Sequence, residues 1–149
     1  MRSITCTRCL EFDAGHRVLG HEGKCAHLHG HRYKVELTAQ AAKLDSLGRV
    51  IDFGVLKKEI GSWIDEKWDH GFLVCSQDTK VISFLSTLPI RGEHVYQKYF
   101  IMESNPTAEN IAEFLLSKSN QIVYDKGIEV VKVKVWETPN CFAEALYHE

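Results

Sequence analysis

The sequence predicts an α+β fold in which an antiparallel sheet is covered by helices on one face. Residues 31–42 and 128–137 alternate polar and apolar side chains, as strands with one buried face do. Residues 53–67 and the segment that follows Pro106 repeat apolar residues at helical spacing. Strand pairs separated by helices are typical of α+β domains.

The sequence predicts two strands followed by a turn and a short third strand at the start of the chain. Residues 2–12 are compatible with a strand, and residues 31–42 form a half-buried strand. The apolar face of this second strand is formed by Tyr33, Val35, Leu37 and Ala39. Residues 44–49 form a turn, and residues 50–52 a short return strand.

The first helix is predicted over residues 53–67, with Asp52 at its N-cap position. Residues 76–94 are ambiguous, although residues 81–88 are compatible with a short helix. Residues 95–102 resemble a strand.

The second helix begins at a start signal, Pro106 followed by Thr107, and the helical region ends at Gly127. Residues 128–137 then form a strand, and residues 141–147 are its expected hairpin partner.

Composition indicates one globular domain, residues 1–149, with 44% hydrophobic residues. The formal net charge of −2 argues against a general nucleic-acid partner. No run of 18 apolar residues indicates a membrane span, and the N-terminal residues lack the apolar stretch of a secretory signal. Five cysteines, an odd number, fit free thiols in a reducing compartment, so we expect a cytoplasmic protein.

The histidines are concentrated in CAHLHGH, residues 25–31. In an extended segment His29 and His31 point the same way, and Gly30 between them permits close approach. If the first two strands pair, His16 returns beside both. Three neutral histidines with one open position form a catalytic zinc site, whereas structural zinc usually has four ligands.

Two alternatives stay open at this point. The histidines are surface residues on a polar loop in the first, because short histidine patterns are common. In the second, Cys6 and Cys9 bind a structural zinc with Cys25 or His27, although strand alternation places Cys6 and Cys9 on opposite faces.

Six motifs in order resemble the 6-pyruvoyltetrahydropterin synthase / 6-carboxytetrahydropterin synthase family over nearly the whole chain. They are Phe12-x-Ala14-x-His16-Arg17, Cys25-x3-His29-Gly30-His31, Val50-Ile51-Asp52-Phe53-x2-Leu56-Lys57, Asp69-His70, Asn105-Pro106-Thr107-Ala108-Glu109-Asn110 and Glu137-Thr138. The resemblance implies the tunnelling fold, a four-stranded antiparallel sheet with two helices on one face. It further implies trimers that close a β-barrel, stacked into a homo-hexamer, and zinc bound by His16, His29 and His31.

The three-residue gap between Cys25 and His29 resembles the carboxy-forming branch of the family, which serves 7-deazaguanine (queuosine precursor) biosynthesis. This branch converts 7,8-dihydroneopterin triphosphate to 6-carboxy-5,6,7,8-tetrahydropterin, acetaldehyde and triphosphate. Formation of 6-pyruvoyltetrahydropterin, side-chain cleavage of the aldolase type and a non-catalytic pterin-binding or metal-binding module are the alternatives.

The resemblance also assigns residue roles. It implies that Cys25, Asp69 and His70 form a proton relay, in which the Asp69 carboxylate orients the His70 imidazole. It places Glu137 at the N–H edge of the pterin, which one carboxylate can bind through two hydrogen bonds. Thr107 is expected to help hold the ring, while capping of the second helix accounts equally well for Glu109.

Two features depart from this simple picture. The inserted residues 76–103 exceed what compact members of the carboxy-forming branch carry and have no role in the prediction. Arg17, Lys24 and Arg32 flank the histidines, but the sequence does not say which of them face a triphosphate.

Overall fold

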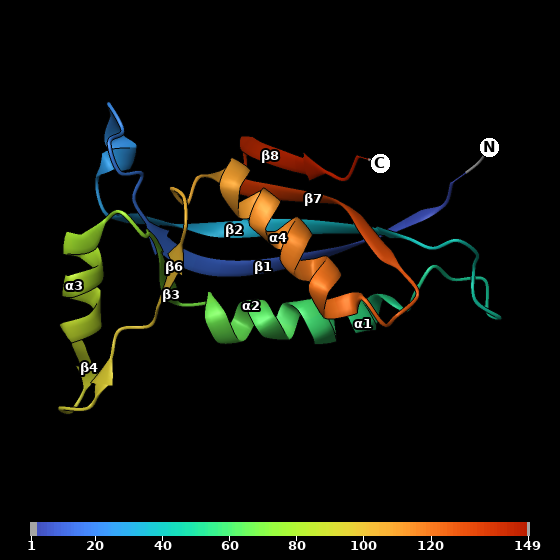
Figure 1. The fold of residues 1–149 in the computed structure, drawn as a ribbon, viewed down its shortest axis with the longest axis horizontal. Helices are drawn as coiled ribbons and strands as arrows, with labels where there is room; N and C mark the ends of the chain where they lie inside the picture. Colours follow the sequence, from blue (N-terminus) through green and yellow to red (C-terminus); the bar gives the residue numbers. More distant parts are fainter. Residues whose placement is uncertain (1–2, 149) are drawn as a thin grey trace.

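The structure, a computed structural model that describes residues 3–148, is built around one six-stranded sheet (Figure 1). Its strand order is β6-β3-β1-β2-β7-β8, and a separate two-stranded ribbon pairs β4 with β5. The strands of the sheet are β1 (Thr5–His16), β2 (His29–Gln40), β3 (Gly71–Cys75), β6 (Tyr99–Met102), β7 (Glu129–Thr138) and β8 (Cys141–Leu146).

Strands β1 and β2 form the centre of the sheet. They pair antiparallel along their whole length, from Thr5 opposite Gln40 to His16 opposite His29. The second strand and its apolar face are confirmed: Tyr33, Val35, Leu37 and Ala39 are all fully buried. The first strand extends beyond the predicted residue 12 to His16, while the predicted start at Arg2 lies outside the described residues.

The first helix occupies the predicted residues. It comprises α1 (Phe53–Leu56), a π-helical stretch over Lys57–Gly61 and α2 (Ser62–Lys67). The Asp52 carboxylate accepts a hydrogen bond from the backbone N–H of Gly54 at 2.7 Å, which confirms the cap.

The predicted return strand over residues 50–52 is wrong, because this segment is an irregular approach to the helix. The Asp45 carboxylate accepts hydrogen bonds from the backbone N–H groups of Leu47 and Arg49 and thereby closes a tight turn. The Arg49 side chain then pairs with both Asp45 and Asp52.

The long helix α4 (Ala108–Val123) and the C-terminal hairpin are confirmed. The Thr107 hydroxyl accepts a hydrogen bond from the backbone N–H of Asn110 at 3.2 Å and caps the helix. The helix crosses one face of the sheet (Figure 1) and buries Ile111, Ala112 and Leu115 against it. Strand β7 pairs antiparallel with both β2 and β8.

The expectation of four antiparallel strands and two helices needs correction, because the sheet is mixed and there is a third helix. Strand β3 lies parallel to β1, and β6 lies parallel to β3. Between these two strands the chain forms α3 (Thr79–Thr87) and the ribbon of β4 (Pro89–Arg91) and β5 (Val95–Tyr96). The predicted strand over residues 95–102 is therefore divided into β5 and β6.

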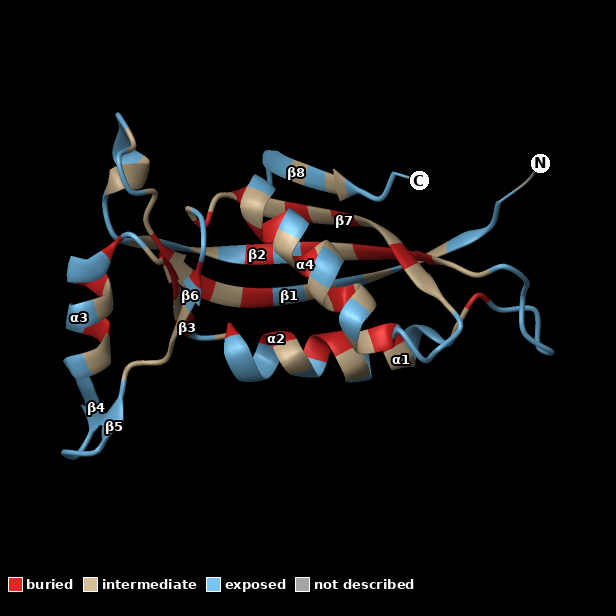
Figure 2. Cartoon of the chain, in the orientation of Figure 1, coloured by how far each residue is buried: buried red, intermediate tan, exposed pale blue. Residues whose placement is uncertain are grey.

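The core lies between the sheet and the helices, as the alternation of buried and accessible residues along the strands shows (Figure 2). Helix α3 and the ribbon project from one end of the molecule in both views. The opposite face of the sheet is polar: Arg32 on β2 pairs with Glu11 and Asp13 on β1. Among residues 3–148, no helix is long and apolar enough to cross a membrane.

Candidate metal centre and active site

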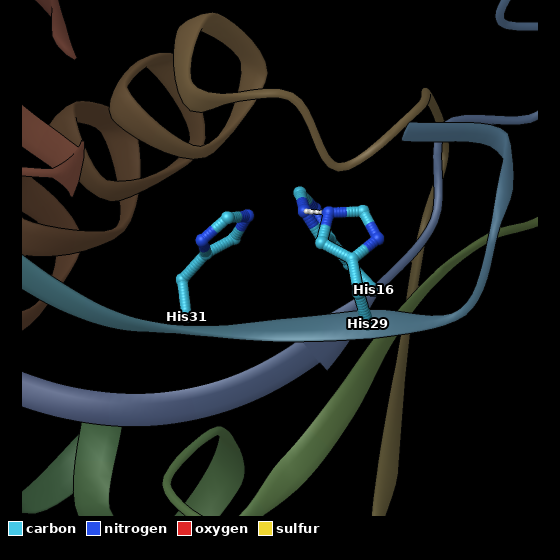
Figure 3. A group of neighbouring side chains, drawn as sticks. All are labelled: His16, His29 and His31. Atoms are coloured by element: carbon cyan, nitrogen blue, oxygen red, sulfur yellow. Dashed lines mark hydrogen bonds between the residues drawn. The ribbon is translucent and has the colours of Figure 1, made fainter. Parts of the chain in front are cut away.

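Three histidines converge where β1 ends and β2 begins (Figure 3). His16 lies opposite His29 in the ladder, and His31 lies two residues further along β2 on the same face. Their potential ligand nitrogens all lie within 4.8 Å of one another. The predicted convergence of His16, His29 and His31 is thus confirmed as a group that could bind a metal ion.

Hydrogen bonds fix the ring orientation of two of these histidines. His16 Nδ1 lies 2.7 Å from the carbonyl oxygen of Pro106, and His29 Nδ1 lies 2.6 Å from that of His27. Because a carbonyl oxygen only accepts, each Nδ1 carries the hydrogen and each Nε2 presents a lone pair. The two Nε2 atoms are only 3.1 Å apart (Figure 3), so a cation between them would relieve the repulsion of the lone pairs.

Burial favours the neutral form of His16 and His31. The pKa of His16 is lowered to about 4, mainly by removal from water. The hydrogen bond to Pro106 opposes this effect, and the neighbouring His29 and His31 add to it. Burial also lowers the pKa of His31, although the charge of Glu137 opposes this effect. Both rings are therefore neutral at pH 7, the form in which imidazole binds a metal.

Glu137, at the end of β7, faces the same group. Its Oε1 atom lies 3.5 Å from His16 Nε2 and 3.7 Å from His31 Nε2. Ligand atoms about 2.0–2.1 Å from a tetrahedral zinc would be about 3.3–3.4 Å apart, close to these separations. The buried Nε2 of His31 has no hydrogen-bond partner among residues 3–148, as expected of an atom whose partner is a metal. The donor set therefore fits a divalent metal such as zinc.

A cavity of about 570 Å³ opens beside Glu137. The β2–β7 ladder ends where Lys34 pairs with Trp136. The cavity adjoins the end of this ladder. Its lining includes His31, Glu137, Thr138 and Pro139, together with Glu11, Arg32 and Lys34 from the polar face of the sheet. Its volume is within the range of small-molecule sites.

Cys25 lies in a short 3-10 turn, Lys24–Ala26, between the two central strands. The backbone N–H of Val18 donates to the Cys25 carbonyl at 2.8 Å and closes this loop. Burial, with added effects of Glu137 and Cys25, raises the pKa of Tyr33, whose hydroxyl lies 3.2 Å from His16 Nδ1. Cys25 thus acts electrostatically on Tyr33, whose hydroxyl contacts His16.

Asp69 and His70 lie together, but on the polar face of the sheet. His70 Nδ1 is 3.0 Å from Asp69 Oδ2, and the His70 side chain is 77% exposed. Together with Asp13 and Arg32, His70 lines a surface cavity of about 420 Å³, and His31 belongs to the lining of this cavity as well as to that of the cavity beside Glu137. Since the His16 side chain points to the helix-covered face and Asp13 to the other, the sheet separates this pair from the metal-binding histidines.

His70 also has an unusual backbone. Its φ of +60° makes it the only residue other than glycine among residues 3–148 with a positive φ, a conformation that side chains disfavour. Burial raises the pKa of Asp69, but hydrogen bonds from the Asp13 backbone and His70, with the charges of His70 and Lys98, outweigh it and lower the pKa. Asp69 is therefore an ionised partner for His70.

The remaining predicted residues occupy clear positions. Thr107 caps α4 and adjoins Pro106, whose carbonyl binds His16, while Glu109 is exposed in the first turn of α4. Both arginines near the histidines are already paired: Arg17 binds Asp78 through two 2.6 Å hydrogen bonds, and Arg32 binds Glu11 and Asp13.

The cysteine alternatives receive no support. All five cysteines are free, and Cys6 and Cys9 belong to neither potential metal-binding group found within residues 3–148. The sequence prediction did not identify the carbonyl of Pro106, because any residue supplies a backbone carbonyl and no residue type marks it.

Comparison with known proteins gives a consistent result. A family model described as 6-pyruvoyl tetrahydropterin synthase matches residues 5–147. The chain is 44% identical over 146 residues to the 6-carboxy-5,6,7,8-tetrahydropterin synthase of Rickettsia felis, covering 95% of this chain and 99% of that protein. It is 33% identical over 136 residues to the protein of the same name from Haemophilus influenzae, with 89% and 92% covered.

Solved structures show the same fold. An uncharacterized protein from Wolinella succinogenes superposes with a TM-score of 0.85 at 25% identity, covering 99% of this chain and 100% of that one. The 6-pyruvoyl tetrahydropterin synthase of Caenorhabditis elegans superposes with a TM-score of 0.69 at 23% identity, with 99% and 98% covered.

Proposed function

Because this chain belongs to the 6-pyruvoyl tetrahydropterin synthase family, we propose that it converts 7,8-dihydroneopterin triphosphate to 6-carboxy-5,6,7,8-tetrahydropterin, with release of acetaldehyde and triphosphate. The activity is that of its relatives named 6-carboxy-5,6,7,8-tetrahydropterin synthase, among them two Rickettsia proteins at 42% and 44% identity over 95% of the chain. The observation that carries the proposal is the cluster of His16, His29 and His31 beside a cavity large enough for a pterin.

His16, His29 and His31 are the proposed zinc ligands. Their Nε2 atoms form the donor set, and the carbonyls of Pro106 and His27 hold two of the rings in place. When bound, zinc would supply Lewis-acid chemistry towards the side-chain oxygens of the substrate.

Substrate contacts are proposed for Glu137 and Thr107. The Glu137 carboxylate lines the cavity and accepts hydrogen bonds from the N–H edge of the pterin. Its 3.5 Å separation from His16 means that a ligand at Glu137 also lies next to the metal-binding histidines. Thr107, which caps α4 next to the Pro106 carbonyl that binds His16, is proposed to help hold the pterin ring.

Proton transfer is assigned to Cys25, Asp69 and His70. Cys25 lies in the turn that joins β1 to β2, the strands that carry the histidines, and would accept a proton as its thiolate. His70 would donate or accept at its exposed ring, while Asp69 holds the Nδ1 hydrogen. Within one chain the sheet separates these two parts, so we propose that His70 acts at the site of a neighbouring subunit.

Both edges of the sheet are available for such an assembly. Strands β6 and β8 end the sheet, and exposed edge strands readily pair with another chain. Phe142 and Leu146 on β8 and Ile101 on β6 are large apolar side chains that are 47–49% exposed. We propose that these edges join subunits into a closed barrel and a homo-hexamer.

Incubation of the purified, zinc-loaded protein with 7,8-dihydroneopterin triphosphate tests the function. The expected products are 6-carboxytetrahydropterin, acetaldehyde and triphosphate. Pyruvoyltetrahydropterin without acetaldehyde would instead establish the pyruvoyl-forming reaction, and absence of turnover with tight pterin binding would indicate a binding module. Sedimentation equilibrium of the same sample measures the oligomeric state.

A further inference from the structure

We infer that Lys98, in the inserted segment that has no predicted role, is a positioning residue for the Asp69–His70 pair. This inference rests on the proposed relay function of that pair. Lys98 directly precedes β6 and is half-buried. Its ammonium donates to the carbonyl oxygen of Asp69 at 2.6 Å and to that of Asp65 at 2.9 Å.

The Asp65 carbonyl belongs to the last turn of α2, where backbone carbonyls lack partners within the helix. A cation at this end is favourable both as a hydrogen-bond donor and as a charge at the helix C-terminus. Lys98 thus ties the end of α2 to the turn that carries His70.

Lys98 also holds the residues that follow His70. Its backbone carbonyl accepts a hydrogen bond from the N–H of Phe72 at 3.1 Å. A Cβ at Gly71 would lie 3.2 Å from Lys98 Cγ and 3.1 Å from the Trp68 carbonyl oxygen, so the lysine stem packs against this glycine. Lys98 therefore contacts the backbone on both sides of His70.

This double contact explains how His70 keeps a strained conformation. The positive φ of His70 costs free energy unless the surroundings enforce it. The His70 N–H donates to the Asp13 carbonyl at 2.7 Å, and the Asp13 N–H donates to Asp69 Oδ1 at 3.0 Å. These bonds fix the turn to β1, and Lys98 fixes it to α2 and β6.

The test compares Lys98→Met, which keeps the stem without the ammonium, with Lys98→Arg, which retains donors. Lys80→Met, at an exposed lysine of the same inserted segment, is the matched control. We expect Lys98→Met to lower kcat about tenfold with KM and zinc content unchanged, because small displacements of catalytic groups slow the chemical step. Lys98→Arg should retain most of the parent kcat, and Lys80→Met should have the kcat of the parent protein.

Hydrogen exchange at the His70 and Gly71 amides gives a readout independent of turnover. Exchange should accelerate in Lys98→Met and not in Lys80→Met, since the His70 amide donates to the Asp13 carbonyl on β1 and the Gly71 amide donates to the Trp68 carbonyl, and both bonds depend on the turn that Lys98 holds. His70→Ala separates the two proposals. If His70→Ala loses activity while Lys98→Met keeps full kcat, the inference about Lys98 is wrong. If His70→Ala itself retains full activity, the relay is refuted and the role of Lys98 falls with it.

Discussion

The Nε2 atoms of His16 and His29 lie 3.1 Å apart, although both rings donate from Nδ1 to backbone carbonyls. Two lone pairs this close to one another repel, and a metal ion bound by both nitrogens would relieve that repulsion. The protein thus orients the rings for coordination through its own backbone, which is the usual arrangement around metal-binding histidines.

His29→Ala is expected to lose bound zinc. Loss of a residue that only hydrogen-bonds to a metal ligand lowers metal affinity about 10–100-fold. Removal of a direct ligand should therefore lower zinc affinity by more than about 100-fold. Metal content and zinc titration measure the effect. His27→Ala is the control, because only the backbone carbonyl of His27 binds His29 and the substitution retains it. Full zinc occupancy in His29→Ala would contradict the assignment.

The histidine group could be predicted from the sequence because it depends on local geometry. Alternation along a strand places His29 and His31 on one face, and a simple hairpin returns His16 beside them. The face occupied by Asp69 and His70 could not be predicted, since it depends on parallel pairing of β3 with β1 across more than fifty residues of chain.

Glu137→Gln should raise KM about tenfold or more while zinc content stays constant. A hydrogen bond to a charged group contributes about 1.5–3 kcal/mol, and the amide keeps the shape but loses the charge and one acceptor. Steady-state kinetics and metal analysis distinguish two roles. Loss of zinc would identify Glu137 as a metal ligand, a role that its 3.5 Å distance to His16 Nε2 also permits. Glu144→Gln on β8 is the control, since Glu144 lies away from the cavity lining.

The outer strands illustrate what periodicity leaves undetermined. Residues 71–75 are a short, mostly buried run, and such a run has no alternation to mark it as a strand. Residues 95–102 are rich in strand-forming residues, yet the strand is interrupted at Gln97 and Lys98. Lys98 reaches back to α2 there, a tertiary contact that overrides local propensity.

Cys25→Ala should lower kcat by about 10²–10⁴-fold, the contribution typical of a general acid or base. Zinc content should remain that of the parent protein, because the three histidines supply the metal ligands. Cys9→Ala removes an exposed thiol from β1 and is the control. Turnover by Cys25→Ala at the parent rate would exclude the thiol from proton transfer.

The ion pair between Arg17 and Asp78 is expected to stabilise the attachment of α3 to the end of β1. Asp78 is 3% exposed and accepts both hydrogen bonds from Arg17 at 2.6 Å. Asp78→Asn leaves the arginine charge uncompensated. The free energy of unfolding should fall by about 3 kcal/mol, which is at the lower end for buried ion pairs because Arg17 is partly accessible. Urea unfolding measures it. Glu11→Gln, which breaks an exposed pair with Arg32, should cost no more than about 1 kcal/mol.

The same pair predicts a pH dependence. The hydrogen bonds from Arg17 lower the pKa of Asp78 from its usual 3.8, against the opposing effect of burial. A carboxyl whose pKa is lower in the folded protein contributes stability that is complete above its unfolded pKa and is lost as pH falls through the folded value. The difference in unfolding free energy between the parent protein and Asp78→Asn should therefore be constant from about pH 5 to 7 and shrink below about pH 4. A difference that stays constant down to pH 2.5 would show that the lowered pKa of Asp78 does not contribute to folding.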